Sequence, residues 1–274
     1  MKRNWLAYPY ILWILVFVLF PMVLVLGYGV VVKTDTGFAL TLQHLQRVFE
    51  PIYLKVIWRS IVLAFISTVI CLFLGYPVAM ILANQNFKQR NVFLALIVIP
   101  MWMNFLARTY AWMSLLERNG LINQFLNFLG LPNLNILYTD YAVVLGMVYN
   151  FLPFMILPIY AVLSKTDRSL IEAAEDLGAT PSVIFRRITF PLSLPGVFAG
   201  IIMVFLPAVT TFAISRLLGG GHYMLIGNLI EQQFLTTQDW SFGAALSTVL
   251  LIGILLIMKV LGRYERDSGG GVLW

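Results

Sequence analysis

The stretch IEAAEDLGATP, Ile171–Pro181, places three carboxylates, those of Glu172, Glu175 and Asp176, between two long apolar runs. Ser169 precedes Glu172 by three residues, which is the capping-box spacing. In that arrangement the Ser hydroxyl accepts a hydrogen bond from the third helical amide, and the Glu carboxylate accepts one from the Ser amide. The pattern therefore predicts that a helix starts at Ser169.

The residues after this helix predict an elbow and a second helix. Gly178 suits the left-handed conformation that ends a helix, because glycine has no Cβ to clash. Thr180 followed by Pro181 is typical of a helix start, with Thr at the N-cap and Pro at the first helical position. Phe190–Pro191 predicts the end of the second helix, since a proline disfavours helical geometry in the residue before it. We expect two short helices joined at a glycine.

The composition places this segment in an integral membrane protein. Of the 274 residues, 60% are hydrophobic and 11% are charged, and the mean hydropathy is +0.88. These values are far from those of a soluble domain. Several spans with short connections would use nearly the whole chain, so we expect one domain, residues 1–274, with no separate soluble part. The only cysteine, Cys71, excludes an intrachain disulfide.

Six runs of about 20 or more mostly apolar residues predict membrane-spanning helices. They cover residues 9–32, 57–83, 92–116, 141–163, 194–218 and 242–261. The first run is too long for the apolar region of a signal peptide, and no small-residue cleavage site follows it. We therefore expect it to remain as a membrane anchor of an all-α protein.

The distribution of Lys and Arg predicts the orientation, because cytoplasmic segments carry an excess of them. With a cytoplasmic N-terminus, ten fall on inner segments: Lys2, Arg3, Lys88, Arg90, Lys165, Arg168, Arg186, Arg187, Arg263 and Arg266. Four fall on outer loops: Lys33, Arg47, Lys55 and Arg118. We expect both termini in the cytoplasm, together with the loop 164–193, which is the longest connection.

On the first short helix, Ala173, Ala174 and Leu177 form a small, smooth apolar face. One interpretation is an amphipathic helix on the inner leaflet. Against it, the acids would face anionic headgroups, and alanines bury little hydrocarbon. The other interpretation is close approach by a second protein, to which a small-residue face ending in glycine is better suited. Glu175 and Asp176 stay unassigned.

The loop 164–193 resembles the EAA loop of ABC-importer permease subunits. The matching residues are Glu172, Ala173, Ala174, Gly178, Phe185, Ile188, Pro191 and Leu192. The resemblance implies the type I ABC-importer permease fold, with six transmembrane helices and a cytoplasmic coupling-helix loop. It also implies that the loop inserts into a groove on a cytoplasmic ATPase subunit, through the coupling residues Glu172, Ala173, Ala174, Gly178 and Phe185.

Further motifs are similar to the PotB-like family of spermidine/putrescine (polyamine) permeases. They are PMWMNFLARTYAWM at 100–113, NGLIN at 119–123, YNFLPFMILPIY at 149–160, LLGGG and IGNLI within 217–230, and DWSFGAA at 239–245. Two positions depart from the family: Ser241 stands where proline is usual, and Met103 replaces threonine, which removes one hydroxyl from a possible lining position. Related families import other solutes, so an opine-like or another small cationic solute remains the alternative.

The resemblance implies a subunit of a larger assembly, embedded as a multi-pass protein in the bacterial cytoplasmic membrane. Its partners would be a second homologous permease, two copies of a cytoplasmic ATPase subunit, an extracytoplasmic solute-binding protein and the lipid bilayer. The chain would not be an enzyme and would hold no cofactor, because ATP and Mg²⁺ would bind in the partner ATPase subunits. The solute would cross by alternating access.

Several residues of the predicted spans are candidates for the solute pathway. Trp102, Tyr110, Trp112 and Tyr149 could hold ammonium groups by cation-π attraction, although interfacial belts are the commoner use of such side chains. Arg108 lies well inside a span, where a guanidinium normally faces a cavity or a partner group rather than lipid. Because Arg108 would repel a polyamine, we prefer a structural role for it over solute contact.

No Asp or Glu lies in the interior of a predicted span. Proton-driven carriers and cation-selective pores normally line their path with carboxylates. The pattern therefore disfavours an ATP-independent channel or secondary carrier, which is the alternative from another class. Among the outer acids, Glu231 and Asp239 are the candidates for a negative mouth that attracts a polycation, against the default of solvated loop charges.

Other polar residues carry weaker predictions. For Asn150 we prefer an interhelical hydrogen bond over solute contact. His44 and His222 have no neighbours at metal-ligand spacing, so no metal is expected. The basic residues are spread thinly rather than massed on one face, which disfavours nucleic acid. Four prolines in the spans predict either hinges or fixed kinks: Pro153, Pro158, Pro195 and Pro207.

Overall fold

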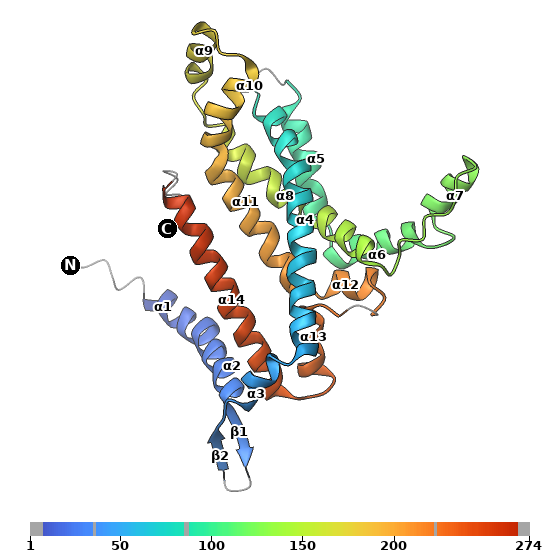
Figure 1. Ribbon diagram of the computed structural model, residues 1–274, viewed down its shortest axis with the longest axis vertical. Helices are drawn as coiled ribbons and strands as arrows, with labels where there is room; N and C mark the ends of the chain where they lie inside the picture. The colour runs from blue at the N-terminus through green and yellow to red at the C-terminus, as the bar shows by residue number, and fades with distance from the viewer. Residues whose placement is uncertain (1–7, 35–36, 85–87, 222–223, 268–274) are drawn as a thin grey trace, which may run out of the picture.

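The computed structural model describes residues 8–34, 37–84, 88–221 and 224–267, and most of them are helical (Figure 1). In chain order the elements are α1 (Tyr8–Ile14), the π-helical segment η2 (Leu15–Leu19), α2 (Phe20–Val30), β1 (Val31–Thr34), β2 (Gly37–Leu40), α3 (Gln43–Val48), α4 (Pro51–Ala83), α5 (Arg90–Trp102), α6 (Phe105–Leu116), α7 (Leu121–Phe128), α8 (Asp140–Leu163), α9 (Ser169–Asp176), α10 (Pro181–Ile184), the π-helical segment η3 (Phe185–Thr189), α11 (Phe190–Thr210), α12 (Ala213–Leu218), α13 (Ile226–Leu235) and α14 (Trp240–Asp267). The expected helical membrane architecture is confirmed, with one short β-hairpin added.

Helix α8 forms the centre of the molecule, because it packs against both α4 and α11. Its side chains Met147, Met155 and Ile159 are fully buried. Glycines let the neighbouring helices approach closely: a Cβ at Gly196 of α11 would lie 2.8 Å from the carbonyl oxygen of Pro158. Small residues at crossings suit helices in a membrane, where burying apolar surface between helices gives no driving force. These three helices form a tight core.

The first and last helices form a second layer beside this core (Figure 1). α2 packs against α14, and a Cβ at Gly29 would lie 3.3 Å from the backbone of Ala245. The most apolar stretch of Tyr8–Val30 has no residue buried within the chain. This helix ends two residues before the predicted end at residue 32, because β1 and β2 pair as an antiparallel hairpin that joins Val31 to Leu40.

Two Phe-Pro pairs are each preceded by a π-helical turn. In η3 the amide of Phe190 donates to the carbonyl of Phe185, five residues earlier, and η2 has the same bond before Pro21. The extra residue in the turn moves the preceding carbonyl away from the proline ring, so the helix continues. The predicted helix end at Pro191 is therefore wrong: Pro181–Thr210 runs as one helix of 30 residues.

The predicted third span, residues 92–116, is not one helix. α5 ends at Trp102, α6 begins at Phe105, and the helical segments on either side of this break bend by 96°. The Asn104 side chain fixes the new start, because its Oδ1 accepts hydrogen bonds from two α6 amides at 2.9 and 3.2 Å. α5 therefore packs along α4 and α8, whereas α6 and α7 leave the bundle sideways (Figure 1).

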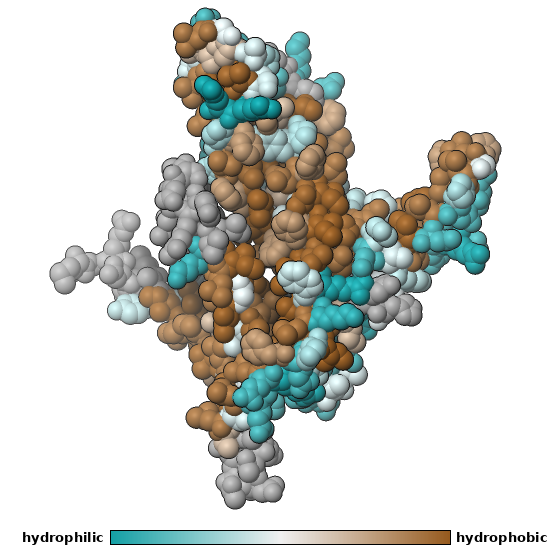
Figure 2. Space-filling model, in the orientation of Figure 1, coloured by the Kyte–Doolittle hydropathy of each residue, from teal (hydrophilic) through white to brown (hydrophobic). Residues whose placement is uncertain are grey.

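The two ends of the molecule carry different elements. α9, α10 and the start of α5 lie at one end, and α3, α13 and the hairpin lie at the other (Figure 1). Figure 2 shows apolar residues over the middle of the bundle and hydrophilic ones toward both ends. Within the described ranges, five helices are long and apolar enough to cross a membrane, or six if the bent pair counts as one span.

Candidate coupling loop and solute site

α9 is a short helix that a glycine ends. Gly178 has the predicted left-handed conformation, with φ +78°. Its amide donates to the carbonyl of Glu175 (2.9 Å), and the amide of Ala179 donates to the carbonyl of Ala174 (3.0 Å). These two bonds form a Schellman motif, which satisfies carbonyls that the end of a helix leaves open. The chain can therefore turn directly from α9 into α10.

The start of α9 differs from the predicted capping box. Ser169 is already helical, and its amide donates to Oδ1 of Asp167 (3.0 Å), so Asp167 supplies the capping oxygen. This hydrogen bond lowers the pKa of the exposed Asp167 carboxyl. Glu172 instead forms an ion pair with Arg168, one turn earlier (3.1 Å). The two reciprocal hydrogen bonds of a Ser169–Glu172 capping box do not form, because Ser169 donates to Asp167 and Glu172 pairs with Arg168.

The apolar face predicted for α9 is accessible. No residue of α9 is buried, Ala173 is exposed and Ala174 is half-buried. Leu177, directly after the helix, is 89% exposed. A large apolar side chain this exposed, beside a face of small residues, is suited to contact with another protein.

The inner side of α9 borders a groove of about 570 Å³. The groove is lined by the ends of α4 and α8 and by the α10–η3 turn, and Arg168, Ile171 and Glu175 contribute from α9 and the residue before it. Glu175 therefore lies along the groove, between α9 and the bundle. Both acids are exposed, but Asp176 is not among the residues that line the groove.

Phe185 connects this loop to the bundle. Its ring lies 5.9 Å from the Tyr76 ring of α4, edge to face, and Phe190 contacts both rings. The Tyr76 hydroxyl is hydrogen-bonded to the Ser193 hydroxyl (2.9 Å). Aromatic contacts of this kind add stability beyond the area that they bury. The segment after α9 is thus joined directly to α4 and α11.

Two of the four aromatic pathway candidates are brought together. The rings of Trp112 on α6 and Tyr149 on α8 lie 5.2 Å apart, edge to face. Trp102 is 85% exposed at the end of α5, and Tyr110 is exposed on α6. The Trp112–Tyr149 contact therefore holds α6 against α8, and the rings of Trp102 and Tyr110 lie at the surface of the chain.

Two polar residues of the spans are buried with incomplete hydrogen bonding. Arg108 is 8% exposed, so it does not face lipid, and its Nε has no hydrogen-bond partner among the described residues. Asn150 does not form the predicted interhelical bond, because its Nδ2 donates to the carbonyl of Gly146 in the same helix (2.9 Å). The neighbouring α12 side chains at Gly146 are apolar, namely Ile214 and Leu218, and offer no partner.

The outer acids do not form a free negative mouth, because three of them are paired with arginines. The pairs are Arg47–Asp239 (3.0 Å), Arg59–Asp140 (2.6 Å) and Arg216–Glu231 (3.0 Å). Asp239 also caps α14, since its Oδ1 accepts from the amide of Phe242 (3.1 Å). The sequence showed these acids and arginines but not their pairing, which joins residues up to 192 positions apart.

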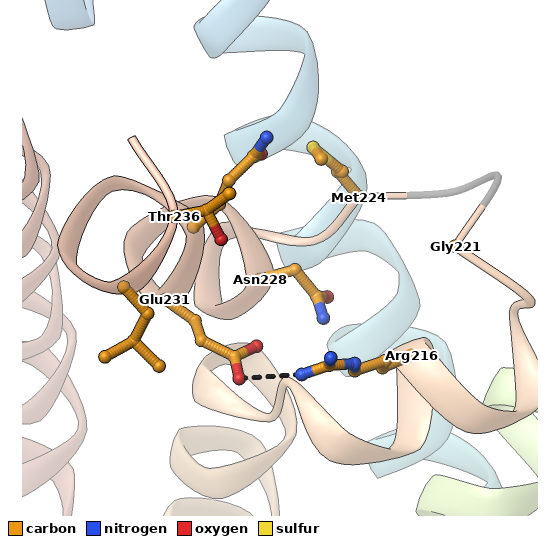
Figure 3. Close-up of a pocket in the computed structure, with 8 residues that line it drawn as sticks. Arg216, Gly221, Met224, Asn228, Glu231 and Thr236 are labelled. Atoms are coloured by element: carbon orange, nitrogen blue, oxygen red, sulfur yellow. Dashed lines mark hydrogen bonds and ion pairs between the residues drawn. The ribbon is translucent and has the colours of Figure 1, made fainter. Parts of the chain in front are cut away.

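Arg216 and Glu231 line a cavity of about 330 Å³ formed by α12, α13 and the adjoining loop segments. Figure 3 shows the Glu231 carboxylate directed at the Arg216 guanidinium. The remaining lining residues are Gly221, Met224, Asn228, Gln232, Leu235 and Thr236. The cavity thus combines one ion pair with amide, hydroxyl and apolar groups.

The metal prediction concerns two histidines. Within the described residues, no group of three His, Cys, Asp or Glu side chains is placed to hold a metal ion. His44 lies in α3, and its Nε2 is buried without a hydrogen-bond partner in the described part of the chain. His222 lies outside the described residues.

Comparison with known proteins defines the class. The family described as "Binding-protein-dependent transport system inner membrane component" matches residues 75–265, which is most of the chain. The chain belongs to this family of transport permeases. Among its relatives, the spermidine/putrescine transport system permease protein PotB of Escherichia coli (strain K12) is 40% identical over 259 residues, 93% of this chain and 94% of PotB. The predicted PotB-like resemblance is confirmed.

Solved structures show the same fold. A bacterial alginate ABC transporter, crystallised with a periplasmic protein that holds an alginate pentasaccharide, matches with a TM-score of 0.82 and 18% identity over 97% of this chain and 96% of that chain. The inward-facing MetNI methionine ABC transporter matches with a TM-score of 0.59 and 20% identity, over 78% and 95%. The expected type I importer-permease fold is confirmed.

Proposed function

We propose that this chain is a transmembrane permease subunit of an ATP-driven importer that carries spermidine and putrescine across the bacterial cytoplasmic membrane. The observation that carries the proposal is the 40% identity to PotB over 93% of the chain. ATP and Mg²⁺ would bind in separate ATPase subunits. This chain would supply part of the pathway and the coupling loop.

The coupling loop would transmit the ATPase motion through α9. Its exposed alanine face, with Glu172, Ala173 and Ala174, would dock in a groove of the ATPase, and Gly178 would allow the close turn that follows. Movement of α9 would reach the core by two routes, the Phe185–Tyr76 ring contact and the continuous helix α10–η3–α11. ATP binding would open the core outward, and hydrolysis would reset it.

The α9 end of the molecule would face the cytoplasm, with both termini on that side. This orientation is supported by the basic residues at the α9 end, which are Lys88, Arg90, Lys165, Arg168, Arg186 and Arg187. Two ATPase subunits would dock at this end, and a solute-binding protein would dock at the opposite end. A second, homologous permease would complete the pathway.

Two other functions are less well supported. The fold is shared with a bacterial ABC transporter involved in the import of the acidic polysaccharide alginate, so the fold does not fix the charge of the cargo. An opine-like or other small cationic solute is the second candidate. The identity to PotB favours polyamines. An ATP-independent channel or secondary carrier is disfavoured by the family and by the absence of carboxylates inside the predicted spans.

Uptake of labelled spermidine and putrescine tests the solute. The measurement uses cells without another polyamine importer that express the complete transporter, with and without this chain. We expect uptake to depend on the chain. Equal uptake in its absence would contradict the proposed cargo.

A Glu172→Arg variant tests the coupling role. The substitution replaces the Arg168–Glu172 pair by two like charges on the docking face, so we expect uptake to be lost while the chain remains in the membrane. Glu117→Arg, at an exposed site at the end of α6, is the matched control and should leave uptake near the wild-type rate. Unchanged uptake in Glu172→Arg would exclude the coupling role.

A further inference from the structure

The Arg216–Glu231 pair differs from another outer ion pair in how its side chains are held. The Arg216 side chain is 67% exposed, whereas that of Glu231 is 21% exposed. In the Arg47–Asp239 pair, the guanidinium also stacks on the Phe242 ring, 4.1 Å from its centre. Arg216 is therefore the loosely held partner of a carboxylate that lies deeper in the cavity.

The helix that carries Glu231 is fixed to α12. Asn228 of α13 donates from Nδ2 to the carbonyl of Phe212 (2.9 Å), and its Oδ1 is hydrogen-bonded to the Ser215 hydroxyl. Glu231 follows Asn228 by three residues, so both side chains emerge from the same side of α13. The carboxylate is held in place, while the long, exposed Arg216 side chain has room to move away.

We propose that Glu231 is a docking site for a primary ammonium group of the solute, which displaces Arg216 from the carboxylate. This inference rests on the proposed function, because spermidine and putrescine are linear amines. The exchange replaces one cation by another, so the half-buried carboxylate keeps a charged partner throughout. A nearby cation favours the charged form of a partly buried carboxylate, and the exchange keeps a cation beside it.

The cavity supplies the other contacts that a linear amine requires. An ammonium group has three donors and no acceptor, and an ionised carboxylate only accepts, so the two groups match in charge and hydrogen bonding. Gln232 and Thr236 offer further acceptor oxygens, and Met224 and Leu235 offer apolar contact for a methylene chain. The volume of about 330 Å³ lies within the range of small-molecule sites.

Two neutral variants distinguish docking from a purely structural ion pair. Glu231→Gln and Arg216→Gln both break the pair, so a structural pair predicts the same loss from each. Docking instead predicts that Glu231→Gln lowers the maximal putrescine uptake rate by about ten-fold, the effect of one lost charge-assisted contact, while Arg216→Gln keeps at least the wild-type rate. Asp140→Asn breaks the comparable Arg59–Asp140 pair outside the cavity and should leave the rate unchanged.

Thiol labelling of the purified complete importer tests binding without transport. With Gln232→Cys in the cavity wall, a cationic methanethiosulfonate should react faster than a neutral one, and millimolar putrescine should slow the reaction. Adding Glu231→Gln should remove both effects. Equal losses of uptake from Glu231→Gln and Arg216→Gln, or labelling that putrescine does not slow, would overturn the docking site. Failure of the wild-type importer to take up polyamines would instead contradict the proposed function, and the docking site with it.

Discussion

At the scale of single residues, Gly178 and Gly130 share one conformation in two different places. Both have positive φ, +78° and +71°, and a Cβ at either would meet no atom within 4 Å. Alanine at either position therefore adds backbone strain of about 1 to 2 kcal/mol without a clash. Gly178 ends α9, whereas Gly130 follows α7, far from α9 (Figure 1).

We expect Gly178→Ala to lower polyamine uptake roughly five-fold or more, because about 1 kcal/mol of strain would loosen the end of the docking helix. Gly130→Ala adds the same backbone strain and should leave uptake near the wild-type rate. Uptake normalised to the amount of chain in the membrane measures both effects. Equal losses would mean that the end of α9 has no special part in coupling.

The stability of the start of α9 should depend on pH through the Asp167 carboxyl. The hydrogen bond from Ser169 lowers the pKa of the folded carboxyl, so this group stabilises the helix start above its unfolded pKa of about 3.9. That contribution is lost as the pH falls through the lowered pKa. Below about pH 4, the first α9 amides should lose hydrogen-exchange protection, corrected for intrinsic rates and measured by mass spectrometry.

The control for this prediction is Asp167→Ala, in which protection should no longer change over that pH range. The same pH dependence in Asp167→Ala would show that another group caps α9. The capping rule failed at Ser169 because the sequence offers two acceptors, two residues apart, and spacing alone does not choose between them. The conformation of Gly178 was predictable because it depends only on the local chain.

At the scale of helices, hydropathy located the apolar runs but not their breaks. Residues 92–116 are apolar on both sides of Asn104, so their composition gives no sign of the 96° bend. Phe190–Pro191, in contrast, looked like a helix end, but η3 lets the helix pass through it. The bend depends on the side-chain cap at Asn104, and the continuation through Pro191 depends on the π-helical turn; neither hydropathy nor the proline rule predicts these hydrogen bonds.

Asn104→Ala should weaken the bend between α5 and α6. It removes the two hydrogen bonds at the start of α6, a loss of about 1 kcal/mol, which corresponds to a fall in Tm of roughly 2 to 4 °C. Asn104→Ser keeps a capping oxygen and should retain most of the stability. Thermal unfolding in detergent measures both variants, and an unchanged Tm in Asn104→Ala would show that the cap does not hold the bend.

At the scale of the whole molecule, the chain leaves much of the apolar surface of its first helix uncovered. The first helix, Tyr8–Val30, has no residue of its most apolar stretch buried, and Gly29 is its one buried residue within the described range. The apolar run at residues 9–32 predicted a membrane-spanning helix here, but no sequence pattern predicted that this helix would touch the rest of the chain so little. In the proposed assembly, lipid or the second permease would cover its apolar surface.

Gly29→Val should separate α2 from α14. A Cβ alone would lie 3.3 Å from the backbone of Ala245, so two further methyl groups would overpack the crossing at a cost of about 2 kcal/mol. Gly27→Val is the matched control, because a Cβ there meets no atom within 4 Å and the change in helix propensity is the same. Thermal unfolding of the complete importer compares the two, and equal shifts in Tm would show that the crossing at Gly29 is unimportant.

The bend between α5 and α6 also bears on how the transmembrane voltage acts on a charged solute. α5 has 13 residues, about 20 Å of helix, against roughly 30 Å of hydrocarbon, so it does not cross the bilayer alone. Water entering beside α6 would shorten the distance over which the transmembrane voltage falls. At an inside-negative voltage of 100 mV, each positive charge gains about 2.3 kcal/mol on moving inward. For the proposed cargo with several ammonium groups, a shortened path would concentrate that driving force on the part of the pathway beside the bend.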